Sequence, residues 1–253
     1  MWTGDYAYLL RQLILKDFKI RYRNMSLGML WSLINPLVMM TIYAYVFSNI
    51  FKSALPHFPV HLLSAIITFN FFAAALQSST TSILDNAGLI KRNPVRREIV
   101  PIAAILSNVP HLLIQMCLLI GLVYVDGLGV NVQWLWLPLV WGLELICLIG
   151  LGLITSSLYV FVRDVRYIVE SSILVLFWVV PIIYSFEMVP ASMRNLYQYN
   201  PLAALVLATH DIVLKAKAPS VILLVKLTFV AVVSLVLGIE VFRRAQRRFY
   251  EYL

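Results

Sequence analysis

The sequence has little charge and little cysteine. Asp, Glu, Lys and Arg make up 13% of its 253 residues, whereas 61% are hydrophobic and the mean hydropathy is +0.86. Because this is too little polar surface to cover a soluble globule, the composition predicts an integral membrane protein. Cys117 and Cys147 lie inside apolar runs, with no His or second Cys at ligand spacing. Neither a metal site nor a disulfide is therefore predicted.

Motifs that usually carry chemistry are also missing. The sequence contains no GxxxxGK[ST] phosphate loop, no HExxH, no GxSxG and no close pair of acidic residues inside an apolar run. The pairs Gly127/Gly129 and Gly150/Gly152 lack the third glycine of a dinucleotide site. We therefore predict no catalytic residue and no cofactor for this chain, and an intramembrane hydrolase finds no support.

The formal net charge of +8 does not indicate nucleic acid binding. The basic residues form short clusters at the ends of apolar runs, which is typical of anchoring at the cytoplasmic face of a membrane. A groove that follows phosphates would need basic residues gathered on one surface.

Windows of about 20 apolar residues predict an all-α protein with six transmembrane helices. They cover residues 30–50, 62–84, 99–125, 134–162, 168–186 and 221–241. Fifteen of the 20 Lys and Arg residues fall on one side of this arrangement, so both termini are expected in the cytoplasm.

The rest of the single membrane domain, 1–253, is predicted to lie at the surfaces of the bilayer. Residues 1–26 form an amphipathic helix in the headgroup plane, and spans one to five occupy 27–186. The external segment 187–220 contains residues 201–214, which are too short to cross and are predicted to be re-entrant. Span six and a cytoplasmic tail fill 221–253. The apolar side of the first helix carries Tyr6, Leu9, Leu10, Leu13, Ile14 and Ile20.

Aromatic residues recur at helical spacing in the first and fifth spans. Such rings could line a path for sugars, whose C–H faces pack on aromatic faces, or they could simply be packing residues. The candidate lining residues are Tyr43, Phe47, Phe51, Phe177 and Tyr184.

The loop between spans two and three, DNAGLIKRNPVRREI, has two interpretations. It is either an ordinary positive-inside loop or a short helix that docks a soluble partner. In the second interpretation Leu89 and Ile90 form an apolar knob, rimmed by Lys91, Arg92, Arg96 and Arg97.

One acidic residue, Glu144, lies deep in a span. It could relay protons, or it could be protonated or bonded to Gln115 or to a hydroxyl of a neighbouring helix.

The sequence resembles the membrane subunit of bacterial type-2 ABC exporters for cell-surface polysaccharides, over nearly its whole length. The densest match to the family pattern is Lys19, Arg21, Tyr22, Ser26, Leu27, Gly28, Trp31 and Pro36. Further matches are Val162 to Val165, Pro181 with Tyr184, and Asn200 with Pro201, although Phe161 sits one position earlier than the family has it.

The resemblance implies a homodimer in the bacterial cytoplasmic (inner) membrane, with two separate ATPase subunits that hold ATP and Mg²⁺. Its substrate would be a lipid-linked polysaccharide of the O-antigen, capsule or teichoic-acid type. The loop between spans two and three would be the coupling helix, through which the ATPase subunits act on the membrane domain. Lys19, Arg21 and Arg23 would meet the lipid headgroup at a gate. The alternatives are a proton-coupled carrier that uses Glu144, and an ABC-type exporter of a non-glycan lipid or drug.

Overall fold

The computed structural model describes residues 6–23, 28–50, 55–92 and 96–252, and every regular element in these ranges is a helix. Within them, five helical stretches are long and apolar enough to cross a membrane. The prediction of an all-α membrane protein is confirmed. The five stretches are Trp31–Asn49, Phe58–Asp85, Ile99–Val125, Val132–Phe161 and Val221–Arg248.

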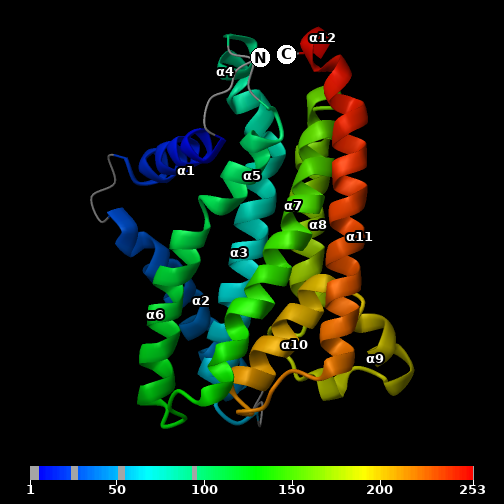
Figure 1. Ribbon diagram of the computed structural model, residues 1–253. Coiled ribbons are helices and arrows are strands. Elements are labelled where there is room, and N and C mark those ends of the chain that lie inside the picture. Colours follow the sequence, from blue (N-terminus) through cyan, green and yellow to red (C-terminus); the bar gives the residue numbers. More distant parts are fainter. Residues whose placement is uncertain (1–5, 24–27, 51–54, 93–95, 253) are drawn as a thin grey trace.

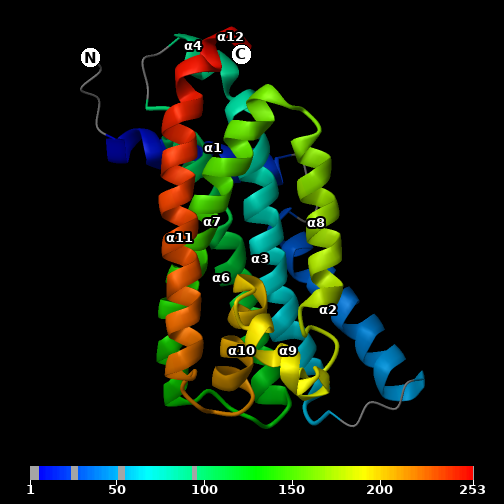
Figure 2. The same ribbon diagram turned by 90° about the vertical axis from the view of Figure 1, so that its right-hand side faces the viewer.

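The long helices stand side by side in one bundle (Figures 1 and 2). Toward one end lie α1, α4 and α12, and toward the other lie α9 and α10, so the first and last described helices share an end. The helices are α1 (Tyr6–Tyr22), α2 (Trp31–Tyr45), α3 (Phe58–Asp85), α4 (Ala87–Arg92), α5 (Ile99–Leu106), α6 (Val109–Val125), α7 (Leu137–Phe161), α8 (Val165–Val179), α9 (Ala191–Tyr197), α10 (Pro201–Val213), α11 (Val221–Ala245) and α12 (Phe249–Tyr252).

The third predicted span is broken into α5 and α6. Pro110 has no amide hydrogen, so the carbonyl of Leu106 loses its helical donor and the chain turns before α6. Side chains satisfy the end of α5: Ser107 Oγ and Asn108 Nδ2 donate to the carbonyl of Ala104 at 2.8 and 2.7 Å. The sequence predicted the span but not this break.

The fifth predicted span, 168–186, is helical only as far as Val179. Val180 is extended, with ψ at 140°, because it precedes Pro181 and is pushed out of the helical region. The 15-residue α8 is about 22 Å long at 1.5 Å per residue, shorter than the hydrocarbon core of about 30 Å. The prediction of a continuous helix to residue 186 was therefore wrong.

Backbone contact joins α7 and α11 more closely than side chains would allow. A Cβ added at Gly150 would lie 2.3 Å from the Ser234 backbone, and one at Gly238 would lie 2.4 Å from the Gly150 carbonyl oxygen. Ser234 Oγ also donates to the Cys147 carbonyl at 3.0 Å. Small residues permit this approach, which membrane helices need because lipid gives them no hydrophobic driving force to associate.

The short helix α10 is buried inside the bundle. Residues 202 to 210 are all buried, and the helix packs against α3, α7 and α11. Its N-terminus is capped by Asn200, whose Oδ1 accepts from Leu202 N at 3.1 Å, and Pro201 occupies the first turn. A short apolar helix surrounded by protein is the arrangement that the re-entrant prediction requires.

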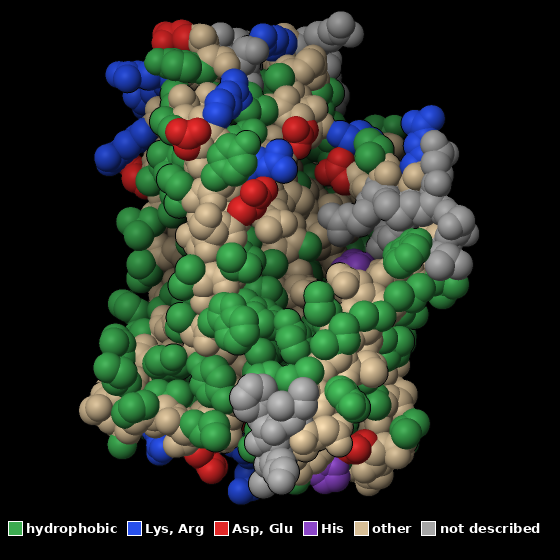
Figure 3. All heavy atoms as spheres, turned by 180° about the vertical axis from the view of Figure 1, so that it is seen from behind, with side chains coloured by type: hydrophobic (Ala, Val, Ile, Leu, Met, Phe, Trp, Pro, Cys, Tyr) green, Lys and Arg blue, Asp and Glu red, His purple; other side chains and the backbone are tan. Residues whose placement is uncertain are grey.

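The surface is divided into zones along the bundle. Seen from behind, charged side chains gather near the two ends, and a band of hydrophobic side chains lies between them (Figure 3). Many apolar residues of α8 and α11 are exposed, among them Leu174, Trp178, Phe229 and Val236. Such a surface is stable only against lipid or another protein.

The α7–α11 contact generates the first prediction. Gly150→Ala should lower the free energy of unfolding by about 1 to 3 kcal/mol, because the new methyl group collides with the Ser234 backbone. Gly142→Ala is the matched control in the same helix, where a Cβ meets nothing within 4 Å. Thermal unfolding of the purified protein in detergent measures both, and equal melting temperatures for the two variants would contradict the close packing.

Candidate substrate path and coupling surface

Three of the aromatic rings lie together where α2, α3 and α8 meet. The centroid of Phe177 lies 5.9 Å from that of Tyr43 and 5.2 Å from that of Phe69, the latter pair edge to face. Tyr43 and Phe177 are half-buried. We call Tyr43, Phe69 and Phe177 the aromatic cluster. The sequence selected two of its members but missed Phe69, which lies close to Phe71 and Phe72 in the second span and is not distinguished from them by its spacing.

The other candidate lining residues lie apart from the aromatic cluster or outside the described residues. Phe47 contacts Phe58, with centroids 6.3 Å apart. Tyr184 lies beyond the end of α8, so it does not share a helix face with Phe177 as the sequence predicted. Its hydroxyl donates back to the carbonyl of Val179 and lies 3.4 Å from the Tyr197 hydroxyl. Phe51 lies outside the described residues.

A polar cleft of about 310 Å³ opens between α3, α7 and α8. It is lined by the polar groups at the end of α3, including Gln77 and Thr81, and by Tyr159 of α7. Arg166 Nε and Glu170 Oε1, 2.8 Å apart, form an ion pair between residues four positions apart in α8. On the opposite wall Thr81 Oγ1 donates to Asp85 Oδ2 at 2.6 Å. The cleft therefore presents hydroxyl, amide and carboxylate groups within reach of one ligand.

A buried apolar cluster unites segments distant in sequence at the end that carries α1, α4 and α12. We call it the end cluster. Ile90 of α4 lies in it with 2% exposure, and Leu89 packs against it. Ile90 is therefore not an exposed docking knob, as the sequence suggested, because the chain itself covers it. The end cluster consists of Leu13, Ile83, Ile90, Ile99, Val100, Ala103, Leu153, Val160, Phe242 and Phe249.

The apolar side of α1 is in part a protein contact. Leu13 is buried in the end cluster, with Leu9, Leu10 and Ile14 packed beside it, whereas Ile20 is 58% exposed. The pKa of the Tyr6 phenol is raised by burial and by the nearby Glu98 carboxylate, against the opposing charge of Arg96. Helix α1 thus rests on the start of α5. Its position in a headgroup layer stays a prediction.

The basic residues of the predicted coupling loop have different surroundings. The Arg97 guanidinium donates to the carbonyl of Gln246 and lies 5.8 Å from the centroid of the Phe249 ring. Lys91 and Arg96 are exposed. The side chain of Arg92 is not among those described. Arg97 therefore contacts the C-terminal segment, and the docking role of Lys91 and Arg96 stays a prediction.

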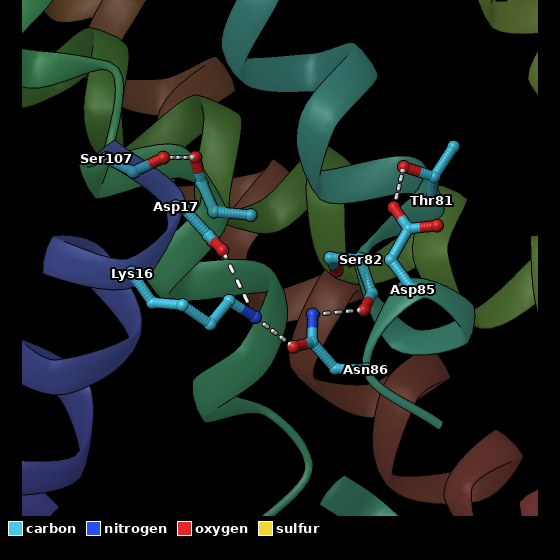
Figure 4. A network of polar contacts seen from close by, with 8 residues as sticks. Lys16, Asp17, Thr81, Ser82, Asp85, Asn86 and Ser107 are labelled. Atoms are coloured by element: carbon cyan, nitrogen blue, oxygen red, sulfur yellow. Dashed lines mark hydrogen bonds and ion pairs between the residues drawn. The ribbon is translucent and has the colours of Figure 1, made fainter. Parts of the chain in front are cut away.

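Lys16 fastens α1 to the end of α3. Figure 4 shows its side chain pointing to Asn86, whose Oδ1 accepts from Lys16 Nζ, while Asp17 Oδ1 lies 3.3 Å from the same nitrogen. The Asn86 amide in turn donates to the Ser82 carbonyl at 2.9 Å. This contact ties the basic helix to a long span.

The candidate headgroup contacts follow in the same helix. Lys19 and Arg23 are exposed, and the side chain of Arg21 is not described. Ser26 and Leu27 of the family pattern lie outside the described residues. The role of Lys19, Arg21 and Arg23 at a gate stays a prediction.

Glu144 is fully buried in α7, and neither of its carboxyl oxygens has a hydrogen-bond partner among the described residues. Of the alternatives that the sequence left open, the bond to Gln115 does not form. Gln115 Nε2 instead donates to the Ser32 carbonyl at 3.1 Å and lies 3.0 Å from His111 Nε2. Gln115 thus joins α6 to α2, and the role of Glu144 stays open.

Two histidines form a buried pair that the sequence did not indicate. The rings of His61 in α3 and His210 in α10 stack with centroids 3.9 Å apart, and His210 Nε2 lies 3.1 Å from the His61 carbonyl oxygen. Their separation in sequence gave no signal for this contact. The pair joins α10 to α3.

Comparisons with known proteins agree on one family. The family described as ABC-2 type transporter matches residues 8–214. The chain is 29% identical over 239 residues to the O-antigen export system permease protein RfbA of Klebsiella pneumoniae, covering 94% of this chain and 92% of that protein. It is 24% identical over 249 residues to the RfbA protein of Myxococcus xanthus, covering 98% and 96%. It is 25% identical over 235 residues to the polysialic acid transport protein KpsM of Escherichia coli, covering 91% of each.

The contacts of Arg97 generate the second prediction. Arg97→Ala should free the C-terminal segment and speed trypsin cleavage after Arg247 and Arg248 by roughly tenfold, the effect of losing one charge-assisted hydrogen bond. Arg96→Ala removes the same charge from an exposed side chain and should leave the rate unchanged. Limited proteolysis followed by mass spectrometry measures both rates. Equal rates for wild type and Arg97→Ala would show that Arg97 does not hold the segment.

Proposed function

Because the chain belongs to the ABC-2 type transporter family, we propose that it is the membrane permease subunit of an ATP-driven exporter of lipid-linked, cell-surface polysaccharide. The observation that carries this proposal is similarity over more than nine-tenths of the chain to proteins named for O-antigen export and for polysialic acid transport. Two kinds of glycan exporter among the relatives favour polysaccharide as the substrate class over a small lipid or drug.

We place the energy source on a separate subunit. The sequence has no phosphate loop of its own, so ATP and Mg²⁺ would be held by two partner ATPases. The end of the bundle with α1, α4 and α12 would face the cytoplasm of the bacterial inner membrane, as the distribution of Lys and Arg indicates. Exposed Lys91 and Arg96 lie at this end.

In this proposal, the end cluster transmits movement of the ATPases to the spans. Ile90 belongs to the same buried cluster as Leu13 of α1, Ile99 of α5 and Phe242 of α11. Because protein interiors are close-packed, α4 cannot be displaced alone, and a push on it must move or strain its neighbours. The coupling surface is thus the exposed rim of α4, and the buried Ile90 is the connection behind it.

The substrate would pass along α2, α3 and α8. The aromatic cluster offers ring faces to the C–H faces of sugars, and the polar cleft offers groups that can bond sugar hydroxyls. The aromatic cluster and the cleft share the face of α8 that is turned toward α3, and another face of α8, with Tyr167, Ser171 and Val175, borders an open groove of about 730 Å³. We propose that a second copy of the chain faces this side and completes the passage.

The coupling surface generates the third prediction. Replacing Lys91 and Arg96 together by Ala should lower the amount of ATPase subunit that co-purifies with the chain by about tenfold, since both charges would lie at the rim of the interface. Arg163→Ala, at the loop between α7 and α8, is the control. Wild-type levels of bound ATPase and of export in the double variant would refute docking at α4.

The aromatic cluster generates the fourth prediction. Tyr43→Leu preserves apolar packing against Phe177 but removes the ring face, so export should fall several-fold, roughly the loss of one aromatic contact. Tyr43→Phe keeps the ring and should retain most export. Surface polysaccharide is quantified in cells with equal amounts of membrane-inserted protein. Normal export by Tyr43→Leu would mean that the ring serves packing alone.

A further inference from the structure

A second groove, unrelated to the proposed sugar path, runs along the bundle between α5 and α11. It encloses about 260 Å³. Helix α7 lies between α5 and α11 in Figure 1 and provides the floor. We call this the α5–α11 groove and define it by Glu98, Ile102, Ile149, Leu153, Ile239 and Arg243.

The groove is apolar along its length and charged at its mouth. Ile102 and Ile239 line its two walls, and Ile149 lies on its floor. Because α5 begins and α11 ends at the same end of the bundle, Glu98 lies one turn above Ile102 and Arg243 lies one turn above Ile239. Both charges therefore occupy the mouth that opens toward the end with α4 and α12.

The two charges at the mouth have opposite sign, yet they do not pair. Among the described residues neither Glu98 nor Arg243 forms an ion pair, whereas the next residue, Arg244, binds Glu240 with Nε and Oε1 2.6 Å apart. The α11 wall of the mouth thus offers the cation Arg243 and the α5 wall the anion Glu98, while the neighbouring Arg97 is engaged by the carbonyl of Gln246. A ligand that carries both charges on one end and hydrocarbon on the other is complementary to this arrangement.

We propose that the α5–α11 groove binds a zwitterionic phospholipid of the surrounding membrane. Its phosphate faces Arg243, its primary ammonium group donates to Glu98, and an acyl chain lies along Ile102, Ile149 and Ile239. A phosphate and an ammonium group form charge-assisted hydrogen bonds with these side chains. The assignment depends on the protein lying in a membrane and not on what it transports.

The bound lipid has a structural consequence. Helix α5 follows the coupling loop directly, and α11 leads to Phe249 in the end cluster. A lipid seated between them braces both helices against α7. It thereby supports the elements that connect α4 to the spans.

The experiment uses the full-length chain in detergent, with added dioleoyl phosphatidylethanolamine or dioleoyl phosphatidylglycerol, and native mass spectrometry to count retained lipids. Wild type should retain phosphatidylethanolamine in preference to phosphatidylglycerol. Glu98→Gln and Arg243→Gln should each lower retention of phosphatidylethanolamine by roughly tenfold, the effect of one lost charge-assisted hydrogen bond. Arg244→Gln removes the same charge from a residue outside the mouth and should match wild type.

A second variant tests the apolar part without changing charge. Ile239→Trp should fill the groove and lower retention of phosphatidylethanolamine while the melting temperature in lipid-free detergent stays near that of wild type. If this variant unfolds, Ile102→Phe serves the same purpose from the opposite wall. Equal retention of the two lipids by wild type, or equal losses in Arg243→Gln and Arg244→Gln, would overturn the proposal.

Discussion

The packing of the end cluster is the interaction on which the functional architecture depends. Leu13 of α1, Ile90 of α4 and Phe242 of α11 all belong to this one buried cluster. Lys16 bound to Asn86, and Arg97 bound to the carbonyl of Gln246, add polar ties to the same region. These contacts pack the segments at the end with α1, α4 and α12 into a single unit. Movement imposed on one segment is therefore expected to reach the others.

Below the end cluster, the bundle is held by contacts suited to a membrane. Lipid is as apolar as leucine, so helices there associate through close approach and hydrogen bonds rather than through the hydrophobic effect. Gly150 and Gly238 let α7 and α11 touch at the backbone, and Thr80 Oγ1 donates to Thr155 Oγ1 at 2.9 Å between α3 and α7. These contacts fix α3, α7 and α11 relative to one another. The polar cleft and the half-buried aromatic rings beside α8 therefore need not hold the bundle together.

Much of the fold could be predicted from the sequence, because the length of an apolar run decides whether a helix can cross a bilayer. The breaks at Asn108 and Val180 were missed, although Pro110 and Pro181 gave the physical signal for both. Less of the candidate site than of the fold could be predicted from the sequence. Tyr43 and Phe177 do lie together, and their role in a path stays a prediction. Ile90 was taken for an exposed knob, since a sequence does not say which segment covers an apolar residue. The pairing of His61 with His210 depends on how α10 folds back, which no local pattern encodes.

We propose that this chain exports polysaccharide with energy supplied by a separate ATPase. The most direct measurement is transport in proteoliposomes that contain the chain, a partner ATPase and a lipid-linked glycan, with appearance of glycan on the far side as the readout. The account predicts export that requires the chain, the ATPase and ATP together, and that persists when the proton gradient is abolished. Export driven by a proton gradient without ATPase, lost on Glu144→Gln, would contradict it.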